Sequence, residues 1–227
     1  MLIPVLLLAG AAGSYAFFPS TWGKARRKLL HRHQTKGHTL YLTFDDGPSP
    51  DYTPALLDLL AEHHVPATFF VVTEFARKNP SIIYRMKEEG HVIGFHSAHH
   101  TSAYLMPPRQ TQEDFSQGLD DLTKLGVPPR LFRPPWGVVN LSSLYQVKKH
   151  RLTPTLWDVM AQDWRGDITT AEIIRRLRVR TRPGSVICLH DGRGAPGAPG
   201  RTIEALSILL PEWLAQGFCF RTLENYG

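Results

Sequence analysis

The chain has 227 residues, enough for one domain with a full hydrophobic core, and a net charge of +6 from 26 Lys and Arg against 20 Asp and Glu. It contains no internal repeat and no low-complexity tract, which excludes repeat and fibrous architectures. The mild positive charge favours a polyanionic surface such as anionic lipid. The sequence contains no basic motif with interleaved aromatic residues, so nothing in it indicates nucleic-acid binding.

The amino-terminal segment differs in composition from the rest. Residues 1–18 are nearly all apolar, and a basic cluster follows them: Lys24, Arg26, Arg27, Lys28 and Arg32. The apolar run spans a membrane only if it extends to Trp22, because a spanning helix needs about 20 residues. A signal peptide is the alternative, although no basic residues precede the run. The basic cluster after the run predicts a cytoplasmic domain by the positive-inside rule.

Strands and helices are predicted to alternate from residue 39 onward. Helices are expected where leucines recur at helical spacing, and strands where short apolar runs meet turn residues. The predicted helices cover residues 53–64 (with Thr53 as N-cap), 81–89, 111–125, 171 to the Pro183-Gly184 pair, and 203–216. The predicted strands cover residues 39–44, 67–72, 91–97, 131–135, 156–159, 185–190 and 218–223. This alternation predicts an α/β fold with a parallel sheet closed as a barrel.

The first predicted strand ends in two adjacent carboxylates. Asp45 and Asp46 follow the apolar run directly, before a Gly-Pro turn. Burying two carboxylates side by side is costly unless a cation or a proton offsets their charge. The pair therefore suggests a metal, with one Asp as its ligand and the other as a base. The alternative is that Asp46-Gly47 only starts a turn.

The strand predicted at residues 91–97 ends in histidines. His96 and His100 stand four residues apart, a spacing that points both imidazoles the same way on a helical turn. His99 is a competing ligand. One Asp with two His is an open ligand set for zinc or a similar divalent ion, and it leaves positions for water and substrate. The cluster therefore indicates a catalytic metal rather than a structural one.

Three further segments carry polar groups. In residues 132–137 the prolines hold Arg133, which would keep a nearby carboxylate ionised and oriented; the alternative is a solvated Arg on a rigid loop. Residues 157–164 end in Asp-Trp, and the strand predicted at residues 185–190 ends in His190. Taken alone, His190 would be interpreted as a core histidine with its hydrogen bonds satisfied.

Together, the five segments resemble the polysaccharide deacetylases (carbohydrate esterase family four), in a membrane-anchored bacterial form. That family carries TFDDGP, H-[ST]-x-x-H, R-P-P-[YFW]-G, DW and L-x-H segments in this order. The resemblance covers residues 37–227, which it implies form a single catalytic domain, a distorted (β/α) barrel with seven or eight parallel strands. Residues 1–36 would be the apolar signal or anchor segment and a basic linker. All the clusters lie at strand carboxyl ends, where such barrels build active sites.

The resemblance also implies a role for each motif residue. The catalytic set would be Asp45 as base, Arg133 to orient it, His190 as general acid and Asp163 paired with His190. The ligands of one divalent metal, expected to be zinc with cobalt or nickel as alternatives, would be Asp46, His96 and His100. The substrate-binding residues would be Trp136, whose backbone N–H helps hold the oxyanion, Trp164, which walls the acetyl pocket, Pro135 and Leu189.

The chain departs from the family pattern at four positions. Phe95 replaces an Asn, Trp136 a Tyr, Met160 an Asp, and Cys188 a larger aliphatic residue. None removes a ligand or a proton carrier, so these changes bear on pocket shape and sugar specificity more than on activity. Both cysteines, Cys188 and Cys219, are predicted to be buried thiols, and neither has the sequence spacing of a cysteine metal site.

The implied activity is removal of N-acetyl groups from polysaccharides containing N-acetylglucosamine, with release of acetate. Peptidoglycan, chitin-like oligomers and exopolysaccharide all fit. The rivals are a metal-dependent amidase or esterase acting on a non-sugar acyl group, a catalytically weak glycan-binding homologue, and a membrane-anchored structural protein. The expected partners are the glycan and, through the amino-terminal segment, a bacterial membrane. Because such glycans lie outside the cell, the resemblance favours an extracellular domain, anchored or secreted.

Overall fold

The computed structural model describes Tyr15 and residues 37–225. The predicted signal or anchor segment and basic linker, residues 1–36, therefore lie outside the described residues apart from Tyr15. Among the described residues, no helix combines the length and the apolar character needed to cross a membrane.

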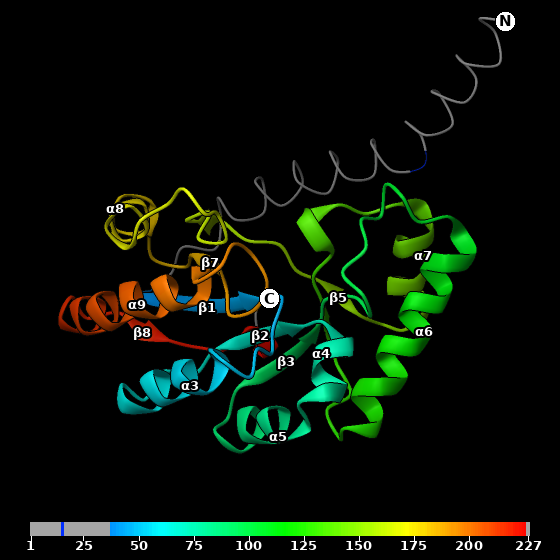
Figure 1. The fold of residues 1–227 in the computed structure, drawn as a ribbon, viewed down its shortest axis with the longest axis horizontal. Helices are drawn as coiled ribbons and strands as arrows, with labels where there is room; N and C mark the ends of the chain where they lie inside the picture. Colours follow the sequence, from blue (N-terminus) through cyan, green and yellow to red (C-terminus); the bar gives the residue numbers. More distant parts are fainter. Residues whose placement is uncertain (1–14, 16–36, 226–227) are drawn as a thin grey trace, which may run out of the picture.

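One parallel sheet organises the molecule (Figure 1). Its strands are β1 (Thr39–Asp45), β2 (Thr68–Val71), β3 (Val92–Phe95), β4 (Leu131–Phe132), β5 (Thr153–Pro154), β6 (Val159–Met160), β7 (Val186–His190) and β8 (Cys219–Phe220). They run in the order β5-β4-β3-β2-β1-β7-β6, and β8 pairs with the start of β1. No pairing among the described residues joins β5 to β6, so the barrel is open there. The predicted α/β class and distorted barrel are confirmed.

Helices cover the outside of this curved sheet in Figure 1, with α8 and α9 beside β7 and β8, and α6 and α7 beyond β5. The helices are α3 (Thr53–Glu62), α4 (Thr73–Lys78), α5 (Pro80–Glu88), α6 (Pro108–Lys124), α7 (Leu141–Lys149), α8 (Thr170–Arg180) and α9 (Ala198–Ala215), with 3₁₀ turns at η2 (Pro135–Gly137) and η3 (Leu223–Asn225). Their apolar faces pack on the sheet, and this burial is the main force that holds the strand ends in place.

The central strand β1 contributes alternate residues to the hydrophobic core and to the barrel interior. Leu40, Leu42 and Phe44 are fully buried in the main hydrophobic cluster. Successive residues of a strand face opposite sides, so Thr43 and Asp45 face the barrel interior instead. In the register, Asp45 lies beside His190 of β7, which sets a carboxylate against an imidazole at the carboxyl end of the sheet.

Three predictions about local structure were wrong: a helix N-cap, the start of a strand and the burial of a cysteine. Thr53 is not an N-cap: Tyr52 precedes the helix, and the Thr53 hydroxyl donates to Asp191 Oδ2 instead, at 2.6 Å. The strand predicted at 156–159 begins only at Val159. The carbonyl of Leu156 accepts a hydrogen bond from Arg133 rather than from a neighbouring strand. Cys219, predicted buried, is exposed on β8, the strand outside the main pairing path.

Close packing between α6 and Phe95 leaves room only for glycine at position 118. A Cβ there would lie 2.2 Å from Cε2 of Phe95, a fully buried ring with no room to move. We expect Gly118→Ala to lower the free energy of unfolding by about 1–3 kcal/mol, the usual cost of overpacking. Gly200→Ala in α9 is the control, because its Cβ would meet Tyr52 at an ordinary 3.4 Å. Urea denaturation measures both variants, and equal stabilities would contradict this account of the packing.

Candidate active site and metal centre

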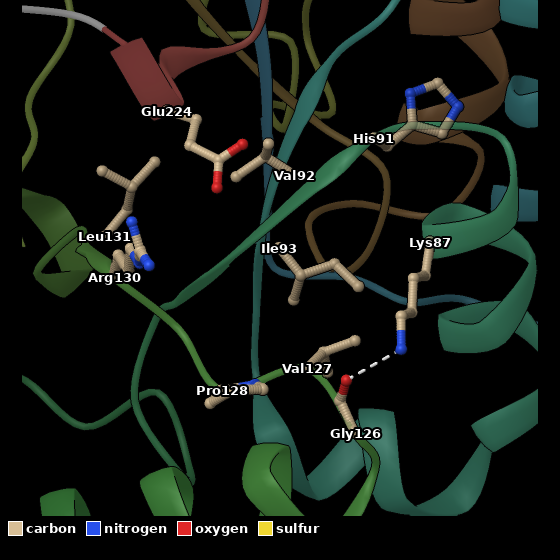
Figure 2. A pocket seen from close by; sticks show the side chains of 10 residues that line it. All are labelled: Lys87, His91, Val92, Ile93, Gly126, Val127, Pro128, Arg130, Leu131 and Glu224. Carbon is tan, nitrogen blue, oxygen red and sulfur yellow. Dashed lines mark hydrogen bonds between the residues drawn. The ribbon is translucent and has the colours of Figure 1, made fainter.

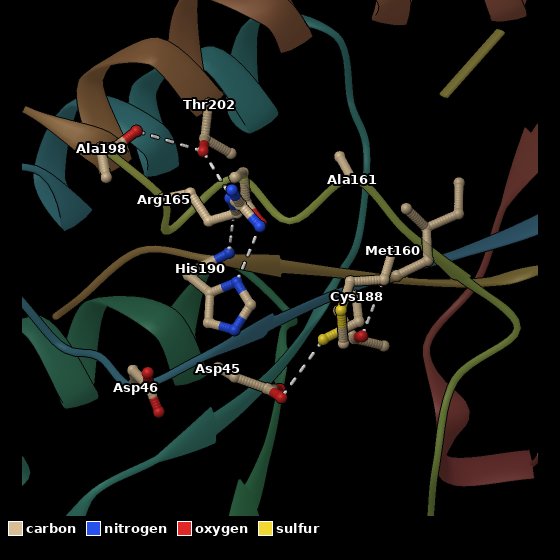
Figure 3. A network of polar contacts seen from close by, with 12 residues as sticks. Asp45, Asp46, Met160, Ala161, Arg165, Cys188, His190, Ala198 and Thr202 are labelled. Atoms are coloured by element: carbon tan, nitrogen blue, oxygen red, sulfur yellow. Dashed lines mark hydrogen bonds and ion pairs between the residues drawn. The ribbon is translucent and has the colours of Figure 1, made fainter. Parts of the chain in front are cut away.

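The carboxyl ends of β1, β3, β4 and β7 bring the predicted catalytic and metal-ligating side chains together. Figure 3 shows three of them, Asp45, Asp46 and His190. Asp45 ends β1 and Asp46 follows it, while His96 follows β3 and Arg133 follows β4. A left-handed backbone at Asp46, with φ of 73°, turns its side chain toward the same side as Asp45. Without that turn, adjacent strand residues would point to opposite faces. In Figure 3 the imidazole of His190 points toward both carboxylates.

Asp46, His96 and His100 form a compact buried group that can hold a metal ion. The Oδ1 atom of Asp46 lies 3.3 Å from His96 Nε2 and 2.9 Å from His100 Nε2. Asp46 Oδ1 is buried, and these two imidazole nitrogens are the polar contacts that it makes. Burial alone would raise the pKa of Asp46, but His100 and His96 hold that pKa well below its usual range. The carboxylate is therefore ionised, as a ligand must be.

The tautomer of His96 supports the same assignment. Its Nδ1 lies 2.7 Å from the carbonyl oxygen of Arg133, which can only accept, so Nδ1 carries the proton. In a neutral imidazole, Nε2 then presents a lone pair to the carboxylate of Asp46. Two electron-rich atoms that face each other in a buried place are stable only with a proton or a metal cation between them. A backbone carbonyl that fixes the ring of a metal-binding His is the usual outer contact of such sites.

The loop from His96 to His100 is not the helical turn that the four-residue spacing predicted. Ser97 and His100 have positive φ values of 103° and 54°, and the two imidazoles converge through this bent backbone. The Ser97 hydroxyl accepts the backbone N–H of His100 and donates to Asp114 Oδ1. Asp114, on α6, also accepts the N–H of Ala98. Sequence analysis did not single out Asp114, because its contact with the loop joins two separate elements.

Arg133 and Asp45 make a buried ion pair, with 2.7 Å between Nη1 and Oδ1. The guanidinium is fully buried and lies over the Phe70 ring, 4.0 Å from its centroid. It also donates to the Thr43 hydroxyl and the carbonyls of Thr155 and Leu156. These bonds fix Asp45, so that its Oδ1 is held by a cation while its Oδ2 accepts a 3.3 Å hydrogen bond from Cys188 Sγ.

His190 and Asp163 form the second charged pair. His190 Nδ1 lies 2.9 Å from Asp163 Oδ1, and the His190 backbone N–H donates to Oδ2 of the same carboxylate. Burial alone would lower the pKa of His190, but the charge and hydrogen bond of Asp163 prevail and raise it to about 9. The imidazole is therefore protonated at neutral pH, and its Nε2–H faces the site.

Of the predicted substrate-binding residues, the two tryptophans lie beside the site, whereas Leu189 lies in the core. Trp136 is 55% exposed and its ring lies 4.3 Å from that of His100, while Trp164 packs edge-on to His190 at 4.9 Å. Both can wall a pocket beside the metal group. Pro135 is buried at the start of η2. Leu189 is fully buried in the core, because it faces the opposite side of β7 from His190, so its placement gives no support to a contact with substrate.

Asp191 is a buried residue at the site that sequence reasoning passed over. Burial raises its pKa to about 7. Its Oδ2 accepts the Thr53 hydroxyl, and a Cβ on Gly47 would lie 2.2 Å from that oxygen. The carboxyl group thus supports the turn that follows Asp46, and only glycine fits against it.

A small pocket at the other end of the strands is separate from this site (Figure 2). It lies at the start of β3 and β4 and is lined by residues that include His91, Arg130 and Glu224. Lys87 closes one side through a 3.1 Å bond to the carbonyl of Gly126. It contains none of the predicted site residues.

The two candidate histidines can be separated experimentally. His100 faces Asp46, whereas the half-exposed His99 pairs with Glu74 at 3.1 Å. We expect His100→Ala to weaken zinc binding by more than the roughly 10- to 100-fold lost when outer contacts of a site are removed. His99→Ala, the matched control, should bind zinc as the unmodified protein does. Calorimetric titration of chelator-treated protein measures both, and equal effects would overturn the ligand assignment.

Comparison with known proteins agrees with this geometry. The family model described as polysaccharide deacetylase matches residues 32–155. A chitooligosaccharide deacetylase of Sinorhizobium fredii is 34% identical over 86% of this chain and 95% of its own length.

Two solved structures are similar to this protein in fold as well as in sequence. A peptidoglycan N-acetylglucosamine deacetylase in complex with an N-oxidanyl-benzamide is 31% identical with a TM-score of 0.78, over 83% of this chain and 87% of that one. A family 4 acetyl xylan esterase from Clostridium thermocellum, in complex with a cobalt ion, is 33% identical with a TM-score of 0.74, over 82% and 88%. The chain belongs to the polysaccharide deacetylase family.

Proposed function

We propose that this protein is a metal-dependent hydrolase that removes N-acetyl groups from glycans containing N-acetylglucosamine and releases acetate. One observation carries the proposal: the Asp45 carboxylate fixed by Arg133 and the imidazolium fixed by Asp163 lie beside the same metal-ligand group. Base, acid and metal ligands are what hydrolysis of an unreactive amide requires. The relatives named as chitooligosaccharide and peptidoglycan N-acetylglucosamine deacetylases support the substrate class.

The metal group fits a divalent ion, with Asp46, His96 and His100 as the ligands. We propose zinc, with cobalt or nickel as alternatives, because imidazole and carboxylate ligands suit these ions. When bound, such an ion supplies Lewis acidity, which polarises an acyl carbonyl and makes water more acidic.

The protein's own residues then handle the protons. Asp45, whose Oδ1 is held by Arg133, accepts the proton of the attacking water. His190, held as an imidazolium by Asp163, donates its Nε2 proton to the nitrogen of the leaving sugar amine. Trp136 and Trp164 flank the ligand group and the acid, where they would limit the size of the acyl group and exclude water.

An ester substrate is the second candidate, favoured by the similarity to an acetyl xylan esterase. Zinc-loaded protein incubated with N-acetylglucosamine oligomers, peptidoglycan fragments and acetylated xylan oligomers separates the two. Mass spectrometry should show the loss of acetyl groups from the N-acetylated oligomers and release of acetate. Deacetylation of xylan alone would show an esterase, and Asp45→Asn is the control for contaminating activity.

The acid role of His190 predicts how activity changes at high pH. Its pKa of about 9 lies above the ordinary value, so the imidazolium is present at lower pH and is lost as pH rises through 9. We expect an alkaline limb of kcat near that pH. Asp163→Asn removes the charge that raises this pKa, so the limb should move to lower pH.

Thr202→Val is the matched control for the Asp163 variant. It removes a 2.8 Å hydrogen bond to Asp163 Oδ2 but leaves the carboxylate and its contact with His190. Its alkaline limb should shift much less. If both limbs coincide with that of the unmodified enzyme, another residue is the acid.

We further propose that residues 1–22 tether the enzyme to a membrane, with the catalytic domain outside the cell. The apolar composition of this segment and a substrate in the cell wall support the proposal. The basic residues that follow the segment argue against this topology. Protease added to intact cells should digest the domain. Protection of the domain until the cells are lysed would show the opposite topology.

A further inference from the structure

A second group of ligand-type side chains lies next to the metal group. Ligand atoms of Asp45, Cys188 and His190 all lie within 4.8 Å of one another. Cys188 Sγ is 3.3 Å from Asp45 Oδ2, and Figure 3 shows this contact below the imidazole of His190. None of the three is a member of the Asp46 group. The side chains come from the paired strands β1 and β7, whose register sets Thr43 beside Cys188 and Asp45 beside His190.

Each of the three presents one ligand atom to the same space. Arg133 occupies Asp45 Oδ1, which leaves Oδ2 facing the thiol. Asp163 occupies His190 Nδ1, which leaves Nε2. A tetrahedral zinc ion with a Zn–S bond near 2.3 Å and a Zn–O bond near 2.1 Å separates sulfur from oxygen by about 3.6 Å. The observed 3.3 Å between Cys188 Sγ and Asp45 Oδ2 is close to that separation.

We propose that Asp45, Cys188 and His190 form a second, inhibitory site for a thiophilic divalent cation, such as cadmium or zinc in excess. An ion there would occupy the base and the acid at once. The inhibition rests on the proposed function, whereas the binding does not. Binding requires that Cys188 releases its thiol proton and that His190 releases the Nε2 proton, each to solvent.

Two features make this site weaker than the group of Asp46, His96 and His100. Arg133 places a positive charge on the other oxygen of Asp45 and repels a cation. Burial raises the pKa of the Cys188 thiol well above its usual value, so the proton is costly to remove. The second site should therefore fill only after the first. It also depends on the cysteine that stands in this chain where the family pattern has a larger aliphatic residue.

Cadmium binding to the purified full chain tests the site directly. A thiolate bound to cadmium gives an ultraviolet charge-transfer band, which the Asp46 group cannot give because it has no sulfur. We expect the band to appear after the first equivalent of cadmium and to be absent in Cys188→Ser, which keeps the size of the side chain, and in Cys188→Leu. Cys219→Ser should keep the band, because Cys219 lies exposed on β8. A band that requires Cys219, or no band in the unmodified chain, overturns the proposal.

Kinetics separates this inference from the proposed function. In the N-acetylglucosamine oligomer assay, the zinc concentration that halves each variant's own activity should rise by roughly tenfold or more in Cys188→Leu, a loss typical of a disturbed metal site. It should stay unchanged in Cys219→Ser. Deacetylation with no band through Cys188 would refute the second site alone. The band through Cys188 without deacetylation would refute the proposed function alone.

Discussion

The buried guanidinium of Arg133 is the interaction on which the rest of the site depends. Its side chain fixes the base Asp45 and the hydroxyl of Thr43, and its backbone carbonyl fixes the ring of the ligand His96. One residue therefore sets the geometry of both the proton acceptor and the metal group. A charge this deeply buried is stable only while its partners remain, because loss of one partner of such a pair costs about 3–5 kcal/mol. The two prolines that follow Arg133 hold its backbone in the required place.

Near Arg133, the protein shifts the pKa values of two site residues in opposite directions. The imidazoles around Asp46 overcome burial and lower its pKa, whereas Asp163 overcomes burial and raises the pKa of His190. An ionised metal ligand and an imidazolium acid can thus coexist in one buried site, because the environment of each group shifts its pKa separately. The strained backbone at Asp46, Ser97 and His100, all with positive φ, is what brings these groups to one point.

The sequence predicted most elements that local pattern controls, although it missed helix α7, and it failed where distant residues decide. Alternating strands and helices and the strand-end carboxylates and histidines follow from periodicity. The shape of the His96–His100 loop does not, because Asp114 from α6 holds it through Ser97. The contact of Cys188 with Asp45 joins residues 143 positions apart and follows only from the register of β1 on β7. The short helix α4, which was not predicted, has only six residues and too little periodicity to be recognised.

The most direct test of this account is the turnover of N-acetylglucosamine oligomers by Arg133→Lys, measured together with its bound zinc. Lysine keeps the positive charge but lacks the planar fork that bonds Asp45, Thr43 and the Leu156 carbonyl together. The account predicts that the variant still binds zinc, because the backbone carbonyl that orients His96 remains, while kcat falls by about 10²- to 10⁴-fold, as when a general base is lost. A folded, zinc-loaded variant with nearly full turnover would contradict the account.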